Sequence, residues 1–106
     1  CGGVQGCLNM CAGNAPELDE KHSFVGRWMD ILRPKYELVK DVTDPSEQLR
    51  QLEKHSVMTS LENLMTFPWL AEKVNSGELT LHGMWTDIAE GGLEYYDPAG
   101  RKFETV

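Results

Sequence analysis

The apolar residues change their spacing at Gly77, and this change limits what the chain can fold into. Before Gly77, over residues 45–76, leucines and valines recur at the spacing of one helix face. After it, Leu79, Leu81 and Trp85 alternate with polar neighbours, which predicts a strand. The glycines at 91 and 92 then favour a turn into a second strand, giving a hairpin over residues 79–97. Because a lone hairpin is only marginally stable, we expect further strands outside this sequence.

The remaining sequence predicts helices over residues 4–11, 23–40 and 45–76. Asp44 and Pro45 suit the N-cap and the first helical position of the last helix, which includes a restart at Pro68. The middle helix should bury one apolar face and should end or continue briefly at Pro34. The residues of that face are Phe24, Trp28, Ile31 and Leu32. The last six residues are expected to be a loose tail or a short strand.

Charge and cysteine content exclude several classes of protein. Seventeen acidic against ten basic residues give a net charge of −7, which disfavours nucleic-acid binding. No apolar run approaches the roughly 18 residues of a membrane span. Three cysteines crowded near the start are not a disulfide framework, and we expect a cytoplasmic protein. The chain opens at Cys1 without methionine, which, with the missing strands, leads us to expect the later half of a larger domain.

Cys1 is the candidate metal ligand. It precedes a predicted helix, whose free N–H groups favour a thiolate, and the glycines at positions 2 and 3 allow close backbone approach. From the residues alone, a terminal thiol with no role is an equal alternative. Cys7 and Cys11 lie one helical turn apart and can in principle chelate a metal, but buried thiols are favoured. Surface or structural roles are favoured for the histidines, which are His22, His55 and His82.

Several distinctive segments follow one another along the chain. They begin with the Cys-Gly-Gly-Val run at residues 1–4 and the Ser-Phe-Val-Gly-Arg-Trp run at residues 23–28, and continue at residues 56–64, 79–88 and 92–96. In this order they resemble the C-terminal half of a bacterial β-class carbonic anhydrase, and the resemblance extends over essentially the whole chain. It implies an α/β domain in which this chain supplies helices and the C-terminal edge hairpin of a mostly parallel sheet.

The resemblance also implies a function and a site. In the family, zinc is held by two cysteines and one histidine, and Cys1 matches the last of these ligands. The other two ligands and the catalytic Asp-Arg pair are expected upstream, so no catalytic residue is assigned within this chain. The implied reaction is hydration of carbon dioxide to bicarbonate by a homodimer or a multiple of dimers, and the isolated chain should be inactive. Alternatives are another small substrate, such as carbon disulfide, or an inert interaction fragment.

Overall fold

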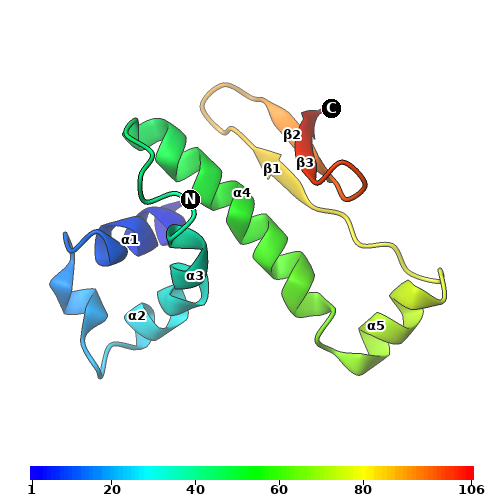
Figure 1. The fold of residues 1–106 in the computed structure, drawn as a ribbon, viewed down its shortest axis with the longest axis horizontal. Helices are drawn as coiled ribbons and strands as arrows, with labels where there is room; N and C mark the ends of the chain where they lie inside the picture. The colour runs from blue at the N-terminus through cyan, green and yellow to red at the C-terminus, as the bar shows by residue number, and fades with distance from the viewer. The chain divides into compact units, whose positions relative to one another are not determined.

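The structure, a computed structural model, describes all 106 residues and divides them into two compact units (Figure 1). The first unit comprises residues 1–56 and the second comprises residues 57–106, so the boundary falls within the long helix α4 (Pro45–Leu64). None of the helices combines the length and the apolar character that a membrane span needs.

The first unit is helical. Its elements are α1 (Gly2–Cys11), η1 (Pro16–Asp19), α2 (Phe24–Met29), η2 (Asp30–Leu32), α3 (Arg33–Tyr36) and the start of α4. The Ser23 hydroxyl accepts a hydrogen bond from the Gly26 N–H at 3.0 Å and caps α2. The Asp44 carboxylate accepts from the Ser46 N–H at 3.2 Å at the start of α4, as expected of an N-cap residue.

The helix predicted over residues 23–40 is divided in the structure. An α-helical turn and a half ends at Met29, a 3₁₀ segment follows, and α3 begins at Arg33. Pro34 explains the division, because it lacks the N–H that an uninterrupted helix needs and is tolerated only in the first turn of a helix, which here is α3. The first helix was predicted over residues 4–11 and begins earlier, at Gly2.

The core of the first unit lies on one face of α1. Val4, Cys7 and Leu8 are buried there and pack with Val39 and with Leu52 of α4. These α1 positions follow the spacing of three and four residues that places side chains on one helix face. The sequence therefore identified the inner face of this helix correctly.

The apolar face predicted for the middle helix is not buried, so that prediction is wrong for this chain. The side chains of Phe24, Trp28 and Ile31 are 84%, 65% and 51% exposed, and only Leu32 packs against the core. A helical period identifies an apolar face but not whether the same chain covers it. In this unit the core is formed by the faces of α1, α4 and the Val39 segment instead.

We predict a large loss of stability for Leu52→Ala. The Leu52 side chain is fully buried, so its truncation leaves a cavity and lowers the free energy of unfolding by about 2–5 kcal/mol. Leu64→Ala on the same helix is the matched control, because Leu64 is 37% exposed, and it should cost about 1 kcal/mol or less. Urea unfolding followed by helical circular dichroism measures both, and equal losses would contradict this assignment of the core.

The second unit contains the end of α4, the helix α5 (Pro68–Asn75) and a small sheet. The helical region predicted over residues 45–76 is broken between Leu64 and Pro68, where proline restarts the helix after the extended residue Phe67. Gly77 has a φ of 82°, a left-handed conformation that glycine adopts without strain. The chain leaves the helices at this residue, where the apolar spacing also changes.

The sheet has three antiparallel strands in the order β1 (Met84–Thr86), β2 (Leu93–Asp97) and β3 (Lys102–Thr105) (Figure 1). Met84 pairs with Tyr95, and Asp97 pairs with Lys102. The tail was expected to be loose or a short strand, and it is the strand β3. The aromatic rings of Tyr96 and Phe103 pack at 5.4 Å across β2 and β3.

The first strand of the predicted hairpin is shorter than expected. A strand was predicted from Leu79 to Ile88, but β1 covers only its centre, and residues 79–83 are not part of the sheet. A final hydrogen bond joins the Tyr96 N–H to the Gly83 carbonyl at 2.8 Å. Beyond it the opposite strand reaches Pro98, which has no N–H to donate, and turns away. Alternation in the sequence shows the strand pattern but not the length over which a partner is present.

Candidate metal centre

Cys1 lies at the N-cap of α1, as the sequence predicted. Its carbonyl accepts a hydrogen bond from the Gln5 N–H at 3.0 Å, which is the first hydrogen bond of the helix. The side chain is exposed and makes no capping hydrogen bond, so its sulfur is available for another partner. The N-terminal N–H groups of a helix and its dipole favour an anion at this position, and a thiolate is the form of cysteine that binds metals.

The two glycines after Cys1 differ in their surroundings: the space beside Gly2 is open, and Gly3 is closely packed. A Cβ atom at Gly2 would meet nothing within 4 Å, so the space beside Cys1 is open. A Cβ atom at Gly3 would lie 3.3 Å from the Trp28 indole and 3.9 Å from the Cys1 sulfur. In the isolated chain the N-terminal ammonium group of Cys1 forms an ion pair with the Glu53 carboxylate at 2.9 Å. Gly3 permits close packing of the Trp28 ring against the first turn of α1.

Neither Trp28 nor Glu53 was assigned to this site from the sequence. Trp28 was expected to lie on a buried helix face, and no role was assigned to Glu53. No sequence pattern links residues so far apart along the chain to Cys1. The only signal was the pair of glycines at positions 2 and 3, which indicated that something approaches closely there.

Cys7 and Cys11 differ from Cys1 in their surroundings. Cys7 is completely buried and Cys11 is partly buried, as predicted for thiols on the inner face of a helix. Their sulfur atoms lie 3.9 Å apart. Burial, together with the charge and hydrogen bond of Cys11, raises the pKa of the Cys7 thiol to about 12. Cys7 is therefore a neutral thiol at physiological pH and a poor nucleophile.

The chain alone does not assemble a complete metal site. No three of its histidine, cysteine, aspartate and glutamate side chains lie close enough together to hold a metal ion. A catalytic zinc needs about three protein ligands in fixed geometry. The exposed sulfur and the open space beside Gly2 fit one ligand of such a site, and Cys1 is the residue that this chain can contribute.

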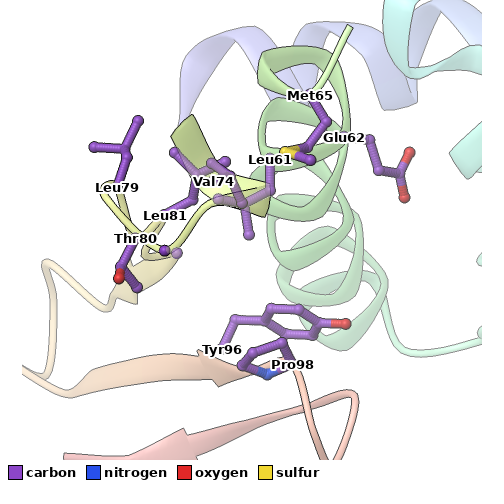
Figure 2. A pocket seen from close by; sticks show the side chains of 11 residues that line it. Leu61, Glu62, Met65, Val74, Leu79, Thr80, Leu81, Tyr96 and Pro98 are labelled. Atoms are coloured by element: carbon purple, nitrogen blue, oxygen red, sulfur yellow. The ribbon is translucent and has the colours of Figure 1, made fainter. Parts of the chain in front are cut away.

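The second unit contains an apolar groove of about 480 Å³, shown in Figure 2. Its walls come from α4, α5, the segment after Gly77 and β2, through Leu61, Val74, Leu81 and Tyr96. A Cβ atom at Gly83 would lie 2.8 Å from a Val57 methyl group, so glycine permits this close packing. Glu62 is the one carboxylate of the lining, which contains neither histidine nor cysteine. The groove therefore carries no catalytic constellation.

Residues 1–93 match the family model described as carbonic anhydrase. The chain is 34% identical over 97 residues to β carbonic anhydrase 5, chloroplastic, of Arabidopsis thaliana, an alignment covering 89% of this chain and 31% of that protein. It is 30% identical over 100 residues to β carbonic anhydrase 3 of the same plant, covering 92% of this chain and 38% of the relative. The chain thus spans about a third of the length of these curated relatives.

A solved structure shows the same architecture. The chain is similar to the structure of the β-carbonic anhydrase CcaA, with a TM-score of 0.83 and 27% sequence identity. The match covers all of this chain and 47% of that chain. The α/β fold class expected from the sequence is thereby confirmed, with the helices and the antiparallel strands at the sheet edge as this chain's share of it.

Proposed function

Because the chain belongs to the β-carbonic anhydrase family, we propose that the protein carrying it catalyses the zinc-dependent, reversible hydration of carbon dioxide to bicarbonate and a proton. The observation that carries this proposal is the position of Cys1. Its exposed sulfur lies at the N-cap of α1, next to open space, within the segment that matches the family model. The absence of a membrane-spanning helix is compatible with a cytoplasmic location, which is part of the proposal.

Within this proposal Cys1 supplies one thiolate ligand to the zinc. The first turn of α1 favours the anionic sulfur. When bound, zinc supplies Lewis-acid activation of water for attack on carbon dioxide.

The remaining ligands and the Asp-Arg pair come from a segment outside this chain. The relatives are about three times as long as the matched region, and no three potential ligands gather within this chain. We call the protein that includes both this chain and that segment the complete protein. It forms a homodimer or a multiple of dimers, which would also cover apolar residues such as Trp28 and Phe24.

The assay that tests the proposal compares two substrates. The complete protein should contain at least one zinc per chain and hydrate carbon dioxide well above background, measured by stopped-flow with a pH indicator. Removal of zinc by a chelator should abolish the activity, and added zinc should restore it. Hydrolysis of carbon disulfide without hydration of carbon dioxide would show that carbon disulfide is the substrate instead. A zinc-loaded protein inactive on both would contradict an enzymatic role.

A further inference from the structure

Cys7 and Cys11 form a pair of thiols that the proposed zinc site does not use. Both lie on α1 one turn apart, which places them on the same helix face. Their sulfur atoms are 3.9 Å apart. Two thiolates bound about 2.3 Å from one tetrahedral ion lie about 3.8 Å from each other. The pair therefore already has the separation that such an ion requires.

The surroundings of the pair hold one sulfur in place and leave the other accessible. Cys7 is fully buried against Val4 and Leu8, so its side chain has little freedom to move away. Its thiol donates a hydrogen bond to the Met29 carbonyl oxygen at 3.5 Å, which orients the sulfur in the metal-free protein. Cys11 is only partly buried, so a ligand can approach the pair from its side.

We propose that Cys7 and Cys11 bind a thiophilic divalent metal ion of the zinc and cadmium class, at a site separate from Cys1. Thiolates select such soft ions over calcium and magnesium. With two protein ligands, water or a small thiol completes the coordination from the exposed side of Cys11. Binding displaces both thiol protons, so the ion must compete with protonation of Cys7, which burial favours. The Arg33 guanidinium acts in the opposite direction by favouring the Cys7 thiolate.

Cadmium titration of the 106-residue chain tests the proposal, because thiolate binding produces a charge-transfer absorption in the ultraviolet. We expect one cadmium ion per chain and the same absorption in Cys1→Ser, which retains the pair. Cys11→Ser should abolish the absorption at the same cadmium concentration. Because Cys11 is only partly buried, the Cys11→Ser variant should keep the helical circular dichroism of the unmodified chain. Cys7→Ala should also lose the absorption. If Cys7→Ala fails to fold, Cys11→Ser still decides the question.

Two results would overturn the proposal. One is an absorption that survives in Cys11→Ser but disappears in Cys1→Ser, which would assign the thiolate to Cys1. The other is no absorption in the unmodified chain at cadmium concentrations that saturate a small dithiol. Since the test uses cadmium binding and not carbon dioxide hydration, its failure leaves the proposed enzymatic function untouched.

Discussion

Replacing Cys1 by serine in the complete protein should remove both the catalytic zinc and carbon dioxide hydration. A serine hydroxyl is far less acidic than a thiol and does not offer an anionic ligand near neutral pH. The site would then retain too few ligands for a stable zinc, and the activated water that the reaction needs would be lost with the metal. We expect zinc content to fall by about one ion per chain by atomic absorption, and hydration to proceed at the background rate.

Gln5→Ser is the matched control for this substitution. Gln5 is an exposed residue on the next turn of α1, and its side chain bonds only to Asn9 at 3.3 Å. The control introduces the same residue into the same helix, so it should leave zinc content and activity within about twofold of the unmodified protein. A Cys1→Ser protein that keeps its zinc and its activity would show that Cys1 is not a ligand.

The isolated 106-residue chain should bind no stoichiometric zinc through Cys1 at the catalytic position and should not hydrate carbon dioxide. One thiolate cannot hold zinc tightly in an open site, because about three protein ligands in fixed geometry are required. Nothing else in the chain lies in a cluster with Cys1 that would supply them. Stopped-flow assays with added zinc should therefore give the rate of buffer alone.

Adding the segment that supplies the remaining ligands should restore zinc binding and hydration together. Co-expression of the two segments as separate chains, or their expression as one, provides this comparison. Zinc-dependent hydration by the isolated chain would show that the site is complete without other ligands. That result would contradict the assignment of Cys1 as one ligand among three.

The helices and the strand region were predictable because both depend on local periodicity. The inner face of α1, with Val4 and Leu8, follows from the spacing alone. The exposure of Phe24 and the short β1 were not predictable, since each depends on what lies opposite the residue and not on its neighbours in the sequence. In both cases the pattern describes an apolar or extended segment whose partner this chain does not provide.

In the candidate site, too, the features set by neighbouring residues were predictable and those set by tertiary packing were not. Cys1, Gly2 and Gly3 are consecutive, so a helix start with a thiol at its N-cap was visible in the sequence. The contacts of Trp28 and Glu53 depend on how α2 and α4 pack against α1, which no local pattern specifies. The metal-ligand role of Cys1 itself remains a prediction from family resemblance and from chemistry.

Thiol labelling of the complete protein tests the ligand role of Cys1 most directly, without any substitution. Iodoacetamide reacts with free thiolates, and peptide mass spectrometry locates the label. Cys7, fully buried with a pKa of about 12, should stay unlabelled throughout and serves as the internal control. We predict that Cys1 is protected in the zinc-loaded protein and becomes labelled once a chelator has removed the zinc. Equal labelling of Cys1 with and without zinc would contradict the account.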